Sequence, residues 1–164
     1  MILKTPAKIN FGLQLLYKRP DGFHELQTIL QMIALFDEME FFVGNGDIKL
    51  ICNKPGVPAD ESNLVFKAAN ALREKFPVKT RSGVIIQLKK NIPAGAGLGG
   101  GSGNAALALL GLNKFWDLGL NCDELITFAV SLGSDVPFFL VSPTALGTGR
   151  GDKIVKIISP RKTA

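Results

Sequence analysis

The stretch Pro93-Ala94-Gly95-Ala96-Gly97-Leu98-Gly99-Gly100-Gly101-Ser102-Gly103 sets the interpretation of the whole chain. Six of its eleven residues are glycine, a segment with strand composition precedes it at 84–88, and an apolar, strongly helix-forming segment follows at 104–110. Glycines allow a backbone to approach an anion closely, and the first amides of a helix lack partners within that helix. This order of strand, glycine loop and helix therefore predicts a cradle for phosphate.

Two standard phosphate loops are alternatives to consider. Gly95, Gly97 and Gly100 satisfy the G-x-G-x-x-G pattern of dinucleotide-binding folds. Such a fold needs a second parallel strand that ends in an acidic residue about twenty positions later, whereas a second helix is expected here from Asn121. A Walker loop would end in Gly-Lys-Ser/Thr, which this stretch lacks. The loop fits neither standard pattern.

Upstream of the loop, the chain has the pattern of antiparallel strands. Apolar and polar residues alternate over 7–15, which predicts a half-buried strand with Lys8 and Asn10 on one face. Pro20-Asp21-Gly22 is a turn signal, and the strand expected at 26–36 completes a long hairpin. Shorter strands are expected at 40–43 and 48–51 around Asn45-Gly46, and later at 138–141, 144–146 and 154–158.

Helices are expected at three places. Ser62 is a candidate N-cap for a helix that ends before Pro77, and the glycine loop leads into a helix that starts near Ser102. Asn121, with Glu124 three positions later, has the spacing of a capping box. Together these elements predict an α+β fold.

Length and composition predict one soluble, cytoplasmic domain. The 164 residues suit one domain, with 46% hydrophobic residues against 20% charged ones. Cys52 and Cys122 have no Cys or His at metal spacing, which favours a reducing compartment. No apolar run reaches the roughly 18 residues of a membrane span, and no secretory signal is evident. The net charge of +5 suits anionic ligands without requiring nucleic acid.

Three polar residues carry no assignment from composition or spacing alone. Lys8 would most simply be a solvated lysine on an outer strand face. Asp135 would be a turn residue ahead of Pro137, and His24 a surface histidine after the Asp21-Gly22 turn.

Four segments together carry a resemblance that extends over essentially the whole chain. They are Ala7-Lys8-Ile9-Asn10, Asp21-Gly22-Phe23-His24-Glu25-Leu26-Gln27-Thr28, the stretch 93–102, and Leu132-Gly133-Ser134-Asp135-Val136-Pro137-Phe138. In this order they resemble the GHMP superfamily of small-molecule kinases, and within it the kinases that act on a cytidine-diphosphate-linked methylerythritol. The resemblance implies the amino-terminal GHMP domain over 1–164, a ribosomal-protein-like, two-layer α+β fold.

The resemblance also implies an activity. It is the ATP-dependent phosphorylation of the 2-hydroxyl of 4-diphosphocytidyl-2-C-methyl-D-erythritol, in the non-mevalonate route to isoprenoid precursors. Asp135 matches the catalytic base and Lys8 its partner lysine, a chemically sensible pair because a hydroxyl needs a positioned carboxylate to take its proton. Residues 93–102 match the loop around the ATP phosphates. Asn10 matches a substrate contact, and Phe23 and His24 match a cytosine-recognition pair. Mg²⁺ is expected with ATP, with its protein ligands unassigned.

The chain departs from the family pattern at three points. Phe23 stands where the family commonly has Tyr, and Gly103 stands where it has Ser. Family members also continue well beyond the position of Ile158 into a second, carboxy-terminal domain, so that domain is expected to be absent here and the chain is expected to have reduced or no activity by itself.

Two other functions stay open at this stage. One is a different GHMP kinase, although mevalonate-type members are not expected to carry the Asp21-Gly22-Phe23-His24 segment. The other is a non-catalytic RNA-binding domain of related fold. Against it, adjacent basic residues occur only at 18–19, 89–90 and 161–162, without interleaved aromatic residues. The expected partner is a small molecule, with neither nucleic acid nor membrane, and the oligomeric state is undetermined.

Overall fold

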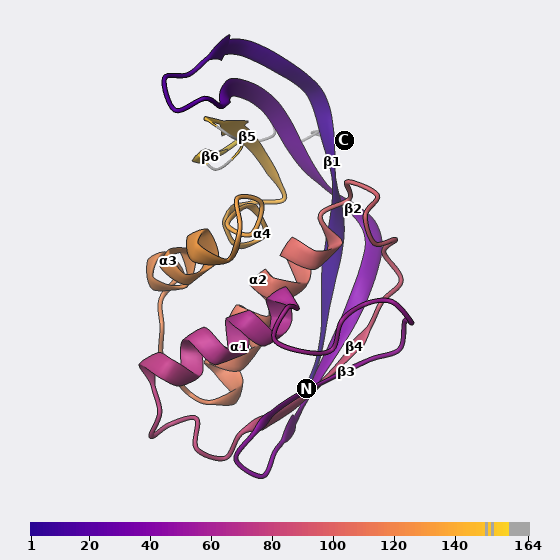
Figure 1. Ribbon diagram of the computed structural model, residues 1–164, viewed down its shortest axis with the longest axis vertical. Coiled ribbons are helices and arrows are strands. Elements are labelled where there is room, and N and C mark those ends of the chain that lie inside the picture. The colour runs from indigo at the N-terminus through magenta and orange to yellow at the C-terminus, as the bar shows by residue number, and fades with distance from the viewer. Residues whose placement is uncertain (150, 152, 158–164) are drawn as a thin grey trace, which may run out of the picture.

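Two long antiparallel strands, β1 (Ile2–Lys18) and β2 (His24–Val43), form the central hairpin of the structure (Figure 1). The computed structural model describes residues 1–149, 151 and 153–157. Between the strands, the turn is closed by the Arg19 amide, which donates to the Phe23 carbonyl at 2.7 Å, and Gly22 supplies a φ of 86°. The predicted hairpin is confirmed, and each strand is longer than the sequence pattern indicated.

The remaining strands extend the sheet on the other side of β2. β4 (Val84–Lys89) pairs antiparallel with the carboxy-terminal part of β2, and β5 (Thr144–Thr148) pairs antiparallel with residues 28–31. β3 (Ile48–Cys52) pairs in parallel with β4, and β6 (Lys153–Lys156) pairs with β5. The order is β3-β4-β2-β5-β6. The segment expected as a separate strand at 40–43 is the end of β2, the strand expected at 48–51 is β3, and β4 lies between them. Residue 158, the end of the last expected strand, lies outside the described residues.

The three long helices cover one face of this sheet (Figure 1). They are α1 (Leu64–Lys75), α2 (Gly100–Phe115) and α3 (Cys122–Leu132). Ten of the sixteen residues of α2 are buried, because the helix lies against β1 and β2 and also contacts α1 and α3. This position explains why its sequence is apolar nearly all round. The α+β architecture predicted from the sequence is confirmed.

The helix starts predicted from capping residues are partly confirmed. The capping box of Asn121 and Glu124 is present, with the Glu124 amide donating to Asn121 Oδ1 at 3.0 Å. The N-cap of α1 is Asn63 rather than Ser62, since Asn63 Oδ1 accepts from the Val65 amide at 2.9 Å while Ser62 bonds to Asp60. α2 starts at Gly100, two residues before the expected position.

The strand expected at 138–141 is wrong. These residues form one helical turn, α4 (Phe138–Val141). Pro137 stands at its N-cap with φ −58° and ψ −33°, and the proline ring fixes φ at a value that suits the start of a helix. The apolar composition that suggested a strand instead serves packing, since Phe138 is fully buried.

No helix in the described part of the chain has both the length and the apolar character that crossing a bilayer requires.

Candidate active site

Lys8 on β1 and Asp135 between α3 and α4 meet in space. Lys8 Nζ lies 3.5 Å from Asp135 Oδ2. The lysine is only 7% exposed, which corrects the interpretation of Lys8 as a solvated surface residue. Its backbone amide also donates to the Leu98 carbonyl at 2.9 Å, so the strand holds the glycine loop directly. These contacts join three of the four segments that the sequence singled out, and Thr28, at the end of the fourth, contacts Asn10.

Asn10 completes the lysine's surroundings on the same strand face, as the alternation predicted. Lys8 Nζ donates to Asn10 Oδ1 at 2.6 Å, and Asn10 Nδ2 donates to Thr28 Oγ1 on β2 at 3.1 Å. The ammonium is therefore fixed between a neutral amide oxygen and a carboxylate.

Asp135 presents a usable carboxylate. Its side chain is 37% exposed, and it follows Gly133, whose carbonyl accepts from the Val136 amide at 3.2 Å in a tight turn. Oδ2 faces Lys8, while Oδ1 has no hydrogen-bond partner among the residues that the structure describes. A carboxylate with one oxygen anchored and the other accessible can accept a proton from a bound hydroxyl.

The glycine loop has the backbone conformation that glycine alone adopts without strain. Gly95, Gly97 and Gly99 have φ values of 73°, 71° and 67°. An added Cβ would meet no atom within 4 Å at Gly95 or Gly97, so this part of the loop opens to solvent. At Gly99 the added Cβ would lie 2.7 Å from Lys8 Cγ, which places the lysine stem directly across the N-cap of α2.

The helix start offers donors for an anion. No side chain caps α2, and its first helical bond runs from the Gly103 amide to the Gly99 carbonyl at 2.8 Å. The amides of Gly100, Gly101 and Ser102 therefore precede the helical ladder and are free of intrahelical acceptors. With the partial positive charge of the helix end and the Lys8 ammonium beside it, the loop fits phosphate groups.

A small cavity beside the loop contains residues that the sequence reasoning missed. It measures about 170 Å³ and is lined by Val57, Asn63, Leu88, Lys90, Ala94, Gly95, Gly101 and Asn104. Asn104 is 2% exposed, and its Oδ1 is buried without a hydrogen-bond partner. A buried acceptor of this kind calls for a donor from a ligand. The signal in the sequence was an asparagine inside an otherwise apolar helix.

Lys90 lines this cavity and belongs to a buried ion pair. Its Nζ donates to Asp37 Oδ2, and the two side chains are 4% and 0% exposed. Asp37 Oδ1 also accepts from the backbone amides of Asn91 and Ile92, at 2.7 and 2.8 Å. An added Cβ at Gly100 would lie 2.9 Å from Lys90 Nζ, so the pair fixes the segment that enters the loop and abuts the start of α2.

Phe23 and His24 lie apart from the Lys8 and Asp135 pair, at the end of the hairpin. Both side chains are exposed, Phe23 to 53%. Thr28 lies four positions after His24 on β2, which corresponds to about 13 Å of strand. Figure 1 shows the hairpin end curving over β5 and β6.

Glu25 anchors the hairpin end to the β5–β6 turn. The Gly149 amide donates to Glu25 Oε1 at 2.8 Å, and Arg19 Nη1 donates to Oε2 at 2.7 Å. These two donors hold the pKa of the Glu25 carboxyl below its usual range, with Gly149 as the larger cause. The position of Phe23 and His24 is therefore fixed by contacts on both strands of the turn.

Gly103, a departure from the family pattern, is explained by packing. A Cβ at this buried position would lie 2.8 Å from Thr5 Oγ1 and 3.1 Å from Phe139 Cε1. Any larger residue would have to displace one of them. Over the part of the chain that is described, no group of three or more His, Cys, Asp or Glu side chains could hold a metal ion.

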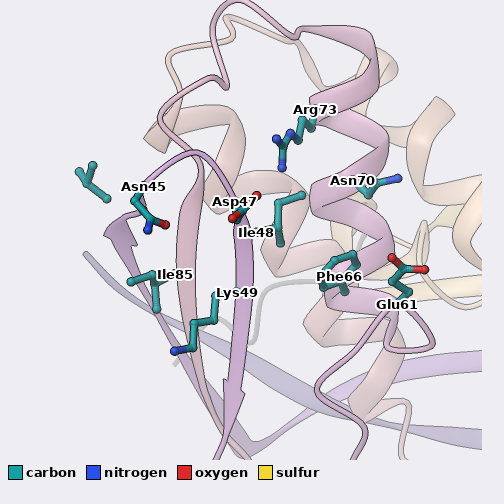
Figure 2. A pocket seen from close by; sticks show the side chains of 11 residues that line it. Asn45, Asp47, Ile48, Lys49, Glu61, Phe66, Asn70, Arg73 and Ile85 are labelled. Atoms are coloured by element: carbon teal, nitrogen blue, oxygen red, sulfur yellow. The ribbon is translucent and has the colours of Figure 1, made fainter.

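A larger cavity lies elsewhere. It measures about 780 Å³ and opens between β3 and α1, with Arg73 and Asn70 projecting from the helix and Lys49 from the strand (Figure 2). None of the residues predicted for the site lines it. Because Asp47 and Glu61 also line it, the cavity has no excess of the positive charge that phosphates require.

Comparisons with known proteins agree on one family. The model of the GHMP kinases N terminal domain matches residues 63–142. The chain is 49% identical to a 4-diphosphocytidyl-2-C-methyl-D-erythritol kinase of Acaryochloris marina, over 94% of this chain and 50% of that protein. It is 45% identical to a protein of the same name from Geobacillus sp., over 98% of this chain and 55% of that one.

Solved structures agree with the sequence relatives. A crystal structure of 4-(cytidine 5'-diphospho)-2C-methyl-D-erythritol kinase matches with a TM-score of 0.83 and 36% identity, over 98% of this chain and 56% of that one. A mevalonate kinase matches with a TM-score of 0.74 at 17% identity, over 96% of this chain and 56% of that one, which concerns the fold alone. The chain spans about half the length of the curated relatives it matches.

Proposed function

Because the chain contains the N-terminal domain of the GHMP kinases, we propose that it provides the ATP-binding and catalytic domain of a kinase that phosphorylates the 2-hydroxyl of 4-diphosphocytidyl-2-C-methyl-D-erythritol. The observation that carries this proposal is the contact of 3.5 Å between Lys8 Nζ and Asp135 Oδ2 beside the start of α2. In such a kinase, a second, carboxy-terminal domain completes the substrate cleft.

The geometry supports a route for the proton. Asp135 Oδ1 accepts the proton of the substrate hydroxyl, and the oxygen attacks the γ-phosphorus of ATP as the bond to the β-phosphate oxygen breaks. Lys8 lies between the carboxylate and the glycine loop, where it offsets the charge that develops on the transferred group. Asn10 contacts the substrate from the same strand face.

The loop 93–102 binds the phosphates through backbone amides. The cavity beside it supports a site for the base of ATP, because the unpartnered Asn104 Oδ1 can accept from an exocyclic amine. Mg²⁺, when bound with ATP, adds charge neutralisation on the phosphates. Since no cluster of protein ligands is present among the described residues, the phosphates themselves are its main ligands in this proposal.

The cytidine end of the substrate belongs at the hairpin end in this proposal. Phe23 offers a ring for stacking and His24 a hydrogen-bonding edge, and about 13 Å of strand between Thr28 and His24 suits a substrate in which a diphosphate separates the base from the reacting alcohol. Cys52 and Cys122 are free thiols, which supports the cytoplasmic location that belongs to the same proposal.

A two-part experiment tests the proposal. Backbone NMR of the chain is recorded with a non-hydrolysable ATP analogue plus Mg²⁺, with cytidine diphosphate, and with NADH. The amides of 95–102 should respond to the ATP analogue, and those near His24 to cytidine diphosphate. A loop that responds to NADH alone contradicts the kinase assignment, and a response to ATP without any response to cytidine diphosphate favours a different GHMP kinase.

Substitutions then test the catalytic roles. In the complete kinase, with its carboxy-terminal domain, Asp135→Asn and Lys8→Ala should each lower turnover by at least about a hundredfold, because a positioned base contributes about 10² or more and Lys8 holds it in place. Affinity for the ATP analogue should change far less. Lys89→Ala is the matched control, because Lys89 is an exposed lysine of β4 paired only with Glu38. Equal losses of turnover and of nucleotide affinity in Asp135→Asn would refute its role as the base.

A further inference from the structure

Thr28 lies at the start of a chain of contacts that ends at the catalytic pair. Its hydroxyl oxygen accepts from Asn10 Nδ2 at 3.1 Å, Asn10 Oδ1 accepts from Lys8 Nζ at 2.6 Å, and Lys8 Nζ lies 3.5 Å from Asp135 Oδ2. Thr28 is 3% exposed. It lies at the end of the segment 21–28 that marks the hairpin, yet neither its sequence position nor the proposed mechanism gives it a role.

The Asn10 side chain supplies the oxygen that accepts a hydrogen bond from the Lys8 ammonium. A carboxamide has one accepting end and one donating end, and an ammonium only donates. Asn10 Nδ2 donates to Thr28 Oγ1 while the Asn10 oxygen accepts from Lys8, so the carboxamide is held at both ends. Without the contact to Thr28, only the ammonium would hold the carboxamide in place. Lysine has a flexible four-carbon stem, so its head stays near Asp135 only while such partners hold it.

Packing holds the Thr28 hydroxyl toward Asn10. Thr28 pairs with Gly147 on β5 and with Leu13 on β1. A Cβ at Gly147 would lie 3.2 Å from Thr28 Cγ2, so the methyl group is in close contact with the β5 backbone. With the methyl directed toward β5, the hydroxyl is left on the side of Asn10.

We propose that Thr28 is a positioning residue, whose hydroxyl anchors the Nδ2 end of the Asn10 carboxamide so that the carboxamide oxygen stays in place to hold Lys8 against Asp135. The consequence for turnover rests on the proposed function; the positioning itself does not. Two substitutions separate the hydroxyl from the methyl group. Thr28→Val keeps the methyl contact with Gly147 and removes the hydroxyl, whereas Thr28→Ser keeps the hydroxyl and removes the methyl.

NMR of the chain measures the positioning without reference to catalysis. The readouts are the Asn10 side-chain amide resonances and the nuclear Overhauser effect between the Lys8 ε-methylene and the Asp135 β-methylene protons. In Thr28→Val the Overhauser effect should fall by more than half and the Asn10 resonances should shift, while Thr28→Ser should keep both. Thr144→Val, which removes a hydroxyl that donates to Gln31 Oε1 on the neighbouring strand, is the control and should also keep both.

Turnover of the proposed reaction is the second readout. In Thr28→Val, kcat should fall about tenfold, as expected for one lost hydrogen bond, with KM for ATP within twofold of the parent. In Thr28→Ser, kcat should stay near the parent value. A Thr28→Val chain with the parent's NMR signals, or a Thr28→Ser chain that behaves like Thr28→Val, overturns the inference. A complete kinase, with its carboxy-terminal domain, that lacks this activity contradicts the proposed function instead, and the NMR comparison still decides the role of Thr28.

Discussion

Lys90→Met should destabilise the chain by about 3 kcal/mol, because it leaves the Asp37 carboxylate buried without its counter-ion. Removing one member of a buried pair generally costs about 3–5 kcal/mol. The lower end applies here, since Asp37 Oδ1 keeps the amides of Asn91 and Ile92 as donors. Asp37 itself is 0% exposed, so water cannot replace the lost ammonium.

Urea unfolding of the chain measures this cost, and the neighbouring lysine provides the control. Lys89 pairs with Glu38 at 3.3 Å, but its side chain is 61% exposed. Lys89→Met should therefore cost less than about 1 kcal/mol. Asp37→Asn with Lys90→Met removes both charges and keeps an acceptor for the two amides, so the double variant should recover part of the loss. A cost below about 1 kcal/mol for Lys90→Met, equal to that of Lys89→Met, would refute the reasoning.

Two further outcomes follow from the packing and the charges. Gly111→Ala should destabilise the chain by about 1–3 kcal/mol, because its Cβ would collide with the buried Phe41 ring. Gly101→Ala, whose Cβ would meet nothing within 4 Å, should be neutral or stabilise α2 by up to about 1 kcal/mol. Thermal unfolding of the two variants checks both signs. The pKa of the Glu25 carboxyl is lowered, so its contacts with Gly149 and Arg19 stabilise the fold above the ordinary pKa range of a carboxyl. This stabilisation is lost as the pH falls through the lowered pKa. Hydrogen exchange at Gly149 should therefore accelerate below that pH in the parent, and Glu25→Gln should abolish this acid dependence.

Local signals predicted local structure well. Asn121 and Glu124 form the capping box that their spacing indicated, and the turn at 20–22 joins the two long strands. The sequence did not decide between two neighbouring residues that both suit the same N-cap position. Ser62 and Asn63 both suit an N-cap, and the choice went to Asn63 because Asp60 accepts from the Ser62 hydroxyl and amide.

Pairing between distant strands could not be read from local patterns. β3 joins the sheet through β4, because α1 carries the chain across the sheet face before β4 pairs with β2. The stretch 138–141 illustrates the same limit: four apolar residues suit a strand or a buried helical turn, and the preceding Pro137 favoured the turn.

The burial of Lys8 could not be predicted from its sequence neighbours, because it depends on contacts that form only in the folded chain. On β1 alone, a lysine between apolar neighbours belongs on a solvated face. In the folded chain, the Leu98 carbonyl binds the Lys8 amide and Gly99 leaves room for its stem, so the loop covers the lysine. Only a glycine at 99 permits that approach, since a Cβ there would lie 2.7 Å from Lys8 Cγ. The glycine that makes the loop suitable for phosphate is thus also the one that lets the ammonium pass over the helix start to Asp135. The proposed phosphate site and the proposed catalytic carboxylate, which lie in separate segments of the sequence, therefore depend on the same backbone position.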